Sequence, residues 1–390
     1  MRAGLRLGRL TLTGFRNYAA LTWRPEGRVA VLYGPNGSGK TNLLEAVSLL
    51  VPGRGLRGAR LADLARRVDG QAGAAWAVAG RFATPQGELD IGTGTPPEGS
   101  ADRRVFRLDG AAPRSQAEIA ARVSAVWLTP QMDGLFQEGA SGRRRFLDRL
   151  VYALEPGHAR EVAAHDTAMA QRNRLLAEGG ADAAWLAGLE EVMARHAVAA
   201  TAARAALVAR LTAALEAGVA GAFPAARLSL SCPIAERLSG GPALAVEDWL
   251  RAALAAGRAA DARAGLALLG AHRADMGLAD AHTGLAAALA STGQQKALLV
   301  GVVLGHAALL AEARGFAPLL LLDEPAVHLD PDCRQALFDA LRALPAQVLL
   351  TGTDRETFLP LRGVAEALRT GGDGLLRDPE FPPAQADAGG

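Results

Sequence analysis

Apolar residues in the first third of the chain come in short runs, the spacing of β-strands. Leucines recur at positions 5, 7, 10 and 12 among polar residues, which predicts a half-buried strand. The run at 19–23 has the length to return antiparallel to it, and the unbroken apolar run at 29–33 is typical of a buried strand. We expect further strands at residues 76–82, at 105–108 and from 126 onward.

The middle of the chain changes to a helical pattern. From about residue 156 to 222, alanine-rich segments carry Leu, Val and Met at helical spacing, and a Gly-rich turn at 178–182 breaks them. This predicts an antiparallel pair of helices. Sustained a/d heptads are missing, which disfavours a long coiled coil. Beyond the pair we expect a strand at 225–232, a short helix at 246–258 and a strand at 265–270.

The last third returns to alternating helix and strand. An apolar helix is predicted at 297–313, and four leucines at 319–322 form a buried-type strand that ends in two acids. A last strand is predicted at 347–351, and the Pro-, Ala- and Gly-rich end of the chain predicts disorder.

Composition narrows the class of protein. Half the residues are apolar but only 5% are aromatic, and the formal net charge is +2, so a nucleic-acid site would have to be a local basic patch. Two cysteines make no metal-ligand pair or disulfide framework, which fits a reducing compartment. We see no signal-peptide core and no uninterrupted apolar run of about 18 residues. The sequence thus predicts a soluble, cytoplasmic protein with no membrane partner.

Residues 34–41 match the phosphate-loop pattern G-x-x-x-x-G-K-[ST], placed between a predicted strand and a predicted helix. Glycines let backbone N–H groups approach phosphates, and the helix N-terminus favours anions. Lys40 can reach the β- and γ-phosphates, and the Thr41 hydroxyl can ligate Mg²⁺. Only two of the 42 basic residues are lysines, Lys40 and Lys296, so a lysine at the motif position is hard to ascribe to chance. The predicted nucleotide-binding residues of the loop are Gly34, Pro35, Asn36, Gly37, Ser38, Gly39, Lys40 and Thr41.

The acids after the four leucines form the other half of an ATP site. Asp323 would hold the Mg²⁺ shell, and Glu324 is placed to activate the attacking water as general base. Two acids at a strand end can also cap a helix. Pro325 follows directly, and the phosphate loop needs a magnesium acid, which favours the catalytic interpretation.

These motifs lie at opposite ends of the chain, yet Thr41 and Asp323 must approach one metal ion. The N- and C-terminal parts must therefore fold together as one α/β head, with the middle as an inserted, mainly α-helical arm. The predicted division is 1–150 for the first part of the head, 151–265 for the arm, 266–375 for the second part and 376–390 for a disordered tail.

Two basic segments are candidate DNA contacts. The segment 53–60 includes Arg57 and Arg60, and a solvated loop is its default interpretation. The segment 141–149 includes Arg143 and Arg144 at a predicted helix start, where cations are unfavourable unless an anion lies nearby. A carboxylate partner and a DNA phosphate both satisfy that requirement, and the ion-paired structural cluster is slightly favoured.

Residues 291–295 (S-T-G-Q-Q) resemble the signature of ABC-type ATPases, an S-x-G-Q run at a helix start. In that superfamily the signature of one subunit completes the γ-phosphate site of the other, so that two ATPs lie inside a dimer. The resemblance implies this role for Ser291, Gly293 and Gln294. An isolated helix N-terminus with Ser and Gly is also, physically, an anion site.

With these motifs together, the chain resembles the RecF family of SMC-like ATPases over residues 1–360. The family-specific parts are R-R-R-F-L-D at 143–148 and H-L-D-x-x-x-R-Q at 328–335; the phosphate loop, the signature and the acid pair are shared with ABC ATPases generally. The resemblance also includes Q-R-N at 171–173 and G-A-H-R-A-D at 270–275. It further implies nucleotide contacts for Arg16, Asn17 and Asp330, and a magnesium-sensing, catalytic role for Gln131.

The chain departs from the family at three points. The acid pair is Asp-Glu where the family more often has Asp-Asp, Ala140 replaces a usual proline, and no histidine stands at 351–354 where transporters carry a switch histidine. Thr353 or Asp354 is the candidate substitute.

The resemblance implies an ATP-driven DNA clamp of recombinational repair and replication. It would act in DNA damage and the SOS response, dimerise on ATP at gapped duplex DNA, help load RecA with RecR and RecO, and open by weak DNA-stimulated hydrolysis. The rivals are a transporter-energising ATPase, a scaffold that uses ATP only for assembly and a chromosome organiser of the SMC type. The short arm without heptads argues against the last, and the arm and the missing switch histidine argue against the first.

Overall fold

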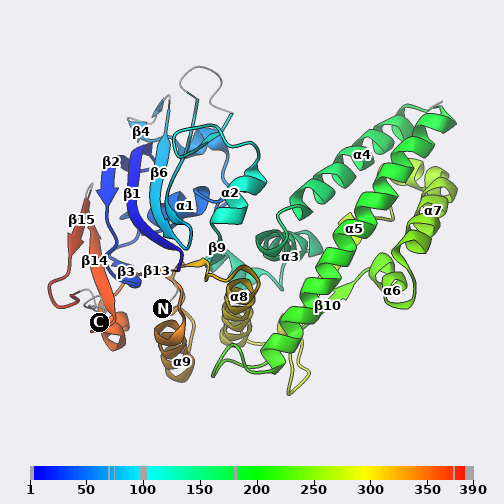
Figure 1. Ribbon diagram of the computed structural model, residues 1–390. Helices are drawn as coiled ribbons and strands as arrows, with labels where there is room; N and C mark the ends of the chain where they lie inside the picture. Colours follow the sequence, from blue (N-terminus) through cyan, green and yellow to red (C-terminus); the bar gives the residue numbers. More distant parts are fainter. Residues whose placement is uncertain are drawn as a thin grey trace. The chain divides into compact units, whose positions relative to one another are not determined.

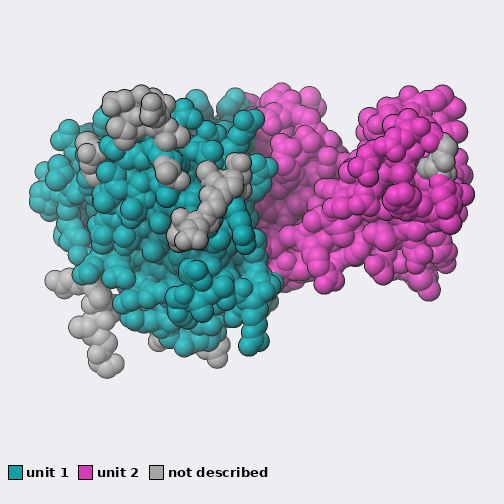
Figure 2. Space-filling view, turned by 90° about the horizontal axis from the view of Figure 1, so that it is seen from above, with its two compact units in different colours: residues 1–133, 219–224, 292–390 teal, residues 134–218, 225–291 magenta. Residues whose placement is uncertain are grey.

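The computed structural model describes residues 4–68, 71–73, 75–96, 103–179, 182–371 and 374–382. The chain divides into two compact units, coloured separately in Figure 2. Unit 1 comprises residues 1–133, 219–224 and 292–390, and unit 2 comprises 134–218 and 225–291. Unit 1 thus combines both ends of the chain. The unit boundaries differ from the predicted ones, since residues 134–150 and 266–291 belong to unit 2.

A six-stranded sheet forms the centre of unit 1 (Figure 1). All of its neighbouring strands are parallel except the edge pair β14–β15, and Leu350 lies in register between Val31 and Leu322. Because the carboxyl ends of parallel strands share one edge, the segments that follow the five parallel strands all start there. In order, the strands are β15 (Gly374–Arg377), β14 (Ala365–Gly371), β3 (Val29–Tyr33), β13 (Val348–Gly352), β12 (Leu319–Leu322) and β9 (Ala125–Leu128).

Helices cover this sheet. Helix α1 (Lys40–Leu49) contacts β12 and β13, and α8 (Thr292–Arg314) contacts β9. Two of the described helices, α5 (Ala183–Glu216) and α8, are long and apolar enough to cross a membrane on composition alone. The sequence-based expectation that no segment could span a membrane considered only uninterrupted apolar runs, so it missed these two helices. In α8, 78% of the apolar window is buried inside the protein, as in the core helix of a globular domain. The remaining helices of unit 1 are α2 (Gln116–Arg122) and α9 (Pro331–Ala343).

A second, antiparallel sheet of five strands completes unit 1. Its order is β2-β1-β6-β7-β8, and Leu12 lies between Leu21 and Val78. The alternation of the first leucines therefore predicted strand β1 correctly, because one face of β1 is buried. The bounds are β2 (Tyr18–Trp23), β1 (Arg6–Phe15), β6 (Ala77–Thr84), β7 (Gly87–Gly94) and β8 (Val105–Leu108).

Unit 2 is mainly helical. Helices α4 (His158–Glu178) and α5 run side by side as the predicted pair, and α7 (Ala243–Ala264) packs on both. Met193, Ala197 and Leu250 lie at the centre of its apolar core. The remaining elements are α3 (Ala140–Leu154), α6 (Pro233–Gly240) and the two-stranded sheet of β10 (Ala226–Ser231) and β11 (Asp275–Asp280).

Two local predictions are wrong. Residues 265–270 form turns after α7, and the strand that follows is β11, because Gly265 and Gly270 both have positive φ. Residues 376–382 are not disordered: β15 pairs with β14, and Phe381 is fully buried. The rest of the predicted tail, 383–390, lies outside the described residues. Short elements are β4 (Arg67–Val68), β5 (Gln71–Ala72) and the 3₁₀ turns η1 (Leu61–Leu64), η2 (Pro130–Gly134), η3 (Ala271–Arg273), η4 (Ala287–Leu289) and η5 (Glu356–Leu361).

Candidate nucleotide-binding site

The predicted phosphate loop lies between β3 and α1, at the carboxyl edge of the six-stranded sheet. Gly37 and Gly39 have φ of 81° and 99°, values that glycine adopts without strain. A Cβ at Gly39 would lie 2.6 Å from the Tyr18 hydroxyl oxygen, so the close packing beneath the loop also requires glycine. Ser38 is hydrogen-bonded to Thr370 on β14 (Oγ to Oγ1, 2.6 Å), which fixes the loop to the neighbouring strand.

Lys40 is held inside the loop. Its Nζ donates to the carbonyl oxygens of Gly34 (2.6 Å) and Pro35 (2.9 Å), and the residue is only 5% exposed. Burial lowers the pKa of the ammonium, and the nearby carboxylates of Glu324 and Asp323 act in the opposite direction. A cation shielded from water and bonded to the carbonyls of its own loop is placed to attract a phosphate.

Asp323 accepts hydrogen bonds from two parts of the chain. Thr41 Oγ1 donates to Asp323 Oδ1 at 2.8 Å, and Thr351 Oγ1 donates to the same oxygen at 2.7 Å. The phosphate loop, the end of β12 and the end of β13 are thus joined at one carboxylate. Hydroxyl and carboxylate oxygens are the ligands that Mg²⁺ prefers. The described residues contain no cluster of three or more His, Cys, Asp and Glu.

Glu324 is held by its backbone. Its N–H donates to Thr351 Oγ1 at 2.9 Å, and its φ of 50° is unusual for a residue other than glycine. Its carbonyl oxygen accepts from Lys296 Nζ (3.1 Å), which also pairs with Asp133 Oδ2 (3.2 Å). Strain held by surrounding contacts is common at active sites. These bonds use only the backbone N–H and carbonyl of Glu324. They orient the residue without engaging its carboxylate.

Lys296 is the site residue that the sequence did not reveal. It lies on α8, and its side chain is 1% exposed. Its place after the S-T-G-Q-Q run suggested only the start of a helix. The composition did contain a signal for its role, because Lys40 and Lys296 are the only two lysines in the sequence. Both lysines lie near Glu324: Lys296 donates to its carbonyl oxygen, and the carboxylate of Glu324 acts on the ammonium of Lys40.

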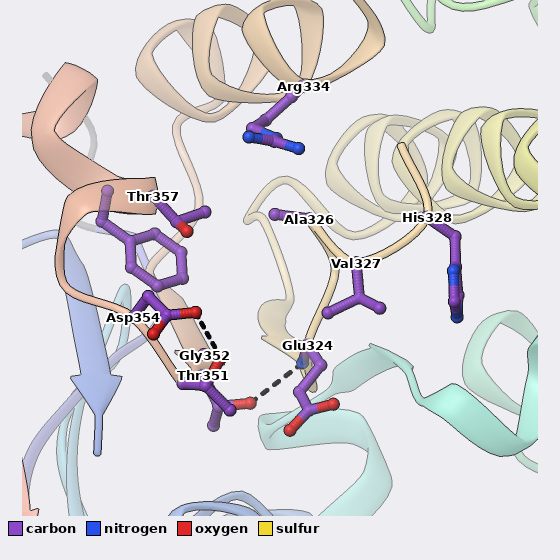
Figure 3. A pocket seen from close by; sticks show the side chains of 11 residues that line it. Glu324, Ala326, Val327, His328, Arg334, Thr351, Gly352, Asp354 and Thr357 are labelled. Carbon is purple, nitrogen blue, oxygen red and sulfur yellow. Dashed lines mark hydrogen bonds between the residues drawn. The ribbon is translucent and has the colours of Figure 1, made fainter. Parts of the chain in front are cut away.

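A small pocket opens beside Glu324. Figure 3 shows Glu324 and Thr351 on one side of it and Arg334 on the opposite side. Thr353 and Asp354, the candidates for the switch position, line the same pocket, and Thr353 Oγ1 donates to Asp354 Oδ2 at 2.9 Å. The end of β13 therefore brings a carboxylate close to Glu324.

The signature residues lie at the start of α8. Ser291 is the last residue of unit 2, and the helix begins at Thr292 in unit 1. A Cβ at Gly293 would lie 3.0 Å from the carbonyl oxygen of His328, so the helix start approaches the backbone after β12 closely. Ser291 and Gln294 are exposed.

The other predicted nucleotide ligands have different places. Gln131 is exposed in η2, after β9, at the same sheet edge as Asp323. Asp330 caps α9, accepting from the Cys333 N–H at 2.8 Å, and this bond lowers the pKa of its carboxyl. In this structure the Asp330 carboxylate therefore caps α9 and has no bond to the phosphate loop among the described residues.

Arg16 and Asn17 contact α1 directly behind the loop. Arg16 makes a bidentate ion pair with Glu45, both bonds 2.8 Å, and Glu45 is buried. Asn17 Oδ1 accepts from Asn42 Nδ2 at 2.7 Å. These residues therefore fix the helix that carries Lys40 and Thr41.

Three of the four candidate DNA arginines have protein partners. Arg57 donates to Asn42 Oδ1 (2.8 Å), whereas Arg60 is exposed before η1. In unit 2, Arg143 forms a bidentate pair with Asp275 (2.7 and 2.9 Å), and Arg144 donates to the Ala274 carbonyl (2.8 Å). The anion expected beside the arginine-rich helix start is therefore a carboxylate of β11.

Known proteins are similar to this chain in sequence. A family model described as the RecF/RecN/SMC N terminal domain matches residues 6–367. The DNA replication and repair protein RecF of Mesorhizobium japonicum is 48% identical over 370 residues, 94% of this chain and 97% of that protein. The protein of the same name from Agrobacterium fabrum is 47% identical over 91% of this chain and 94% of its own.

Solved structures agree in fold. The recombination mediator protein RecF with ATP, in the RecFOR pathway, has a TM-score of 0.82 at 20% identity, covering 96% of this chain and 98% of that one. An Smc head bound to the C-winged helix domain of ScpA has a TM-score of 0.54 at 16% identity, covering 95% and 96%.

Fold and site together define an SMC-type head of the ABC ATPase class, built from both ends of the chain around a phosphate loop. Within that class, the chain belongs to the RecF family. The predicted fold class and family are confirmed, and so is the assignment to DNA repair and replication.

Proposed function

We propose that this protein is an ATP-dependent DNA clamp of recombinational repair and replication. It dimerises on ATP at gapped duplex DNA, helps load RecA and is opened by slow, DNA-stimulated hydrolysis. The observation that carries the proposal is the junction of Thr41 and Asp323, which assembles both halves of a nucleotide site from opposite ends of the chain.

The residues present fit ATP and Mg²⁺. Residues 34–39 and the N-terminus of α1 offer backbone donors to the phosphates, and Lys40 adds the point charge. Thr41 and Asp323 would ligate Mg²⁺, with Gln131 as a further ligand from the end of β9. Bound there, Mg²⁺ would neutralise charge that develops on the phosphates.

Hydrolysis is assigned to Glu324. Its carboxylate would accept a proton from the attacking water, while Thr351 and Lys296 hold its backbone in place. Asp354, on the same pocket, would orient water or sense the γ-phosphate where transporters use a histidine. Lys40 would stabilise the negative charge on the β- and γ-phosphate oxygens as the bond to ADP breaks.

Dimerisation is assigned to the start of α8. Ser291, Gly293 and Gln294 would cover the γ-phosphate of a second copy, because a helix N-terminus attracts anions. Arg16 and Asn17 would support the nucleotide from behind α1, and Asp330 would support it from the start of α9. By the family resemblance the partners are RecR and RecO, in the cytoplasm and with no membrane subunit; a solved RecF with ATP is assigned to the RecFOR pathway.

DNA binding is assigned to arginines. Arg60 is exposed, while Arg57, Arg143 and Arg144 would have to exchange or share their protein partners. Removing one arginine–phosphate ion pair should lower the salt dependence of DNA binding by about one unit of slope. Arg60→Ala should therefore weaken DNA binding and flatten its salt dependence more than Arg143→Ala.

The test measures retention on gapped duplex DNA. A Glu324→Gln variant bound to ATP should remain on a gapped duplex after a salt wash, and the wild type should dissociate as it hydrolyses ATP. Equal retention of both proteins with ATP and with ADP would reject the clamp and favour a scaffold, and co-purification with a membrane subunit would favour a transporter ATPase.

A further inference from the structure

Unit 2 contains a basic cavity that the nucleotide site does not use. Its volume is about 350 Å³, enough for a small oxyanion and its waters. Four segments line it: α3, α4, α5 and the turn before β11. The side chains that matter are Ser141, Arg144, Arg145, His165, Arg204 and His272.

Two histidines in the cavity have their tautomers fixed. His272 Nε2 lies 2.9 Å from the Ala267 carbonyl, which can only accept, so Nε2 carries the hydrogen and Nδ1 presents a lone pair. His165 Nδ1 lies 3.0 Å from Asp166 Oδ1, so its Nε2 presents a lone pair. Neither His272 Nδ1 nor His165 Nε2 has a partner among the described residues, and the His165 side chain is 1% exposed.

Gly270 brings these two nitrogens to one point. A Cβ at Gly270 would lie 2.8 Å from His272 Nδ1 and 2.9 Å from His165 Nε2. The space that a side chain would fill is therefore flanked by two buried acceptors. An unpartnered buried nitrogen is costly, so this arrangement calls for a ligand or a proton.

Charge around the cavity favours an anion. Asp148 is neutralised by Arg204 (2.7 and 2.9 Å), and Asp166 is half exposed and bonded to His165. Arg145 is exposed and reaches the cavity, and Arg144 lines it as well. The first turn of α3 adds Ser141 and a helix N-terminus, and it contains no acidic residue. A metal cation would face these guanidinium groups, whereas an oxyanion would be attracted by them.

We propose that this cavity binds a phosphate group. Arg144, Arg145 and the first turn of α3 would hold its oxygens, and His272 would donate to it from Nδ1 once that nitrogen takes up a proton. The phosphate could be carried by a free anion or by a nucleic-acid backbone; the shared chemistry is a tetrahedral oxyanion. The cavity lies wholly within unit 2, so the inference stands apart from the ATP site in unit 1.

The first test uses the full chain saturated with Mg·ADP and titrated with inorganic phosphate at constant ionic strength. Ring ¹⁵N resonances of His165 and His272, assigned from His165→Asn and His272→Asn, report on the cavity and not on the phosphate loop. Both should shift saturably. Arg145→Ala should weaken phosphate binding roughly tenfold, because it removes a charge-assisted contact. Arg174→Ala, an exposed arginine on α4 with a 67% exposed side chain, should leave it unchanged.

A pH series sharpens the test. Burial lowers the pKa of His272, and the charges of His165, Arg144 and Arg273 add to the effect. Binding of an anion must therefore be accompanied by uptake of a proton from solvent by His272. Sulfate, which does not titrate near neutrality, should bind more tightly as pH falls from 8 to 6, by up to about tenfold per pH unit. The replacement of His272 by Asn should flatten this dependence. The other charged groups that face the pair are Arg145 and Asp148 on α3, Asp166 on α4 and Arg204 on α5.

The source of the phosphate is separated by repeating the titration with gapped duplex DNA. If DNA moves the same two resonances and Arg145→Ala weakens DNA binding, the ligand is a backbone phosphate; if only free phosphate moves them, it is a small anion. The proposal is overturned if neither ligand shifts them saturably, if Arg145→Ala has no effect on either, or if Zn²⁺ shifts them while phosphate does not.

Discussion

Thr41 Oγ1 donates a 2.8 Å hydrogen bond to Asp323 Oδ1 across 282 residues of sequence. The first residue is in the phosphate loop helix, and the second ends β12. The chain between them leaves unit 1, builds unit 2 and returns. The shared parallel sheet explains how the two residues meet, because β3, β13 and β12 are neighbours with their carboxyl ends together.

Under the proposed function, Asp323 is the position at which ATP hydrolysis is most sensitive to substitution. Asp323→Asn should lower ATP hydrolysis by roughly 100-fold or more, because an amide is a poor ligand for Mg²⁺. Thr41→Ser keeps the hydroxyl and should remain within a few-fold of the wild type. Steady-state ATPase rates at saturating Mg²⁺ compare them, and near-normal hydrolysis by the Asn variant would contradict the assignment.

Lys296 should act through the backbone of Glu324. Lys296→Met removes the bond to the Glu324 carbonyl and leaves Asp133 unpaired, so we expect kcat to fall while ATP affinity changes little. Because the pair is largely buried, unfolding free energy should drop by about 2–4 kcal/mol.

The double variant Asp133→Asn, Lys296→Met separates the two effects. It should regain part of the stability, since no carboxylate is left unpaired, without regaining kcat. Denaturant unfolding and nucleotide titration measure both. A Lys296→Met protein with normal kcat would show that Lys296 supports only the fold.

The core of unit 2 depends on Arg172. Its guanidinium is fully buried and donates to Glu190 (2.9 Å), to Asp261 (2.7 Å) and to the Leu254 carbonyl (2.8 Å). Arg172→Met should destabilise the protein by about 3–5 kcal/mol, because Asp261 remains buried without its partner.

The matched control is Arg174→Ala, two residues along the same helix, whose 3.9 Å pair with Glu178 is exposed. It should change unfolding free energy by less than about 0.5 kcal/mol. Urea unfolding followed by circular dichroism compares the two variants, and similar midpoints would contradict the importance assigned to the buried network.

The Arg143–Asp275 pair should make stability depend on acid pH. The hydrogen bond from Arg143 lowers the pKa of the Asp275 carboxyl below its ordinary value of 3.8. A lowered folded-state pKa means that the stabilisation is complete above the ordinary value and disappears as pH falls through the folded-state value. Arg143→Gln should therefore flatten the decline in stability below about pH 4, measured by urea unfolding from pH 5 to 2.5. An unchanged acid profile would contradict the prediction.

Much of the head could be predicted from sequence because its signals are local. The leucines of β12 and the apolar run of β3 are continuous because both faces of a parallel sheet are buried. The meeting of Thr41 and Asp323 was predicted from chemistry, because the proposed Mg²⁺ ion would need a ligand from each.

Other features depend on long-range packing that no local pattern contains. Lys296 lies in an apolar helix, and its partner is a backbone carbonyl 28 residues away. Arg143 had two possible anionic partners, and only the fold shows that β11 supplies one. Residues 265–270 contain alternating leucines that favour a strand, but positive φ at both flanking glycines turns the chain there.

The most direct measurement is the sedimentation mass of the Glu324→Gln protein, with ATP and with ADP. We predict a dimer with ATP and a monomer with ADP. Adding Ser291→Arg should give a monomer with either nucleotide, because the larger side chain would block the surface that covers the γ-phosphate of the second copy. A Glu324→Gln protein that stays monomeric when saturated with ATP would contradict the claim that a second copy completes the site.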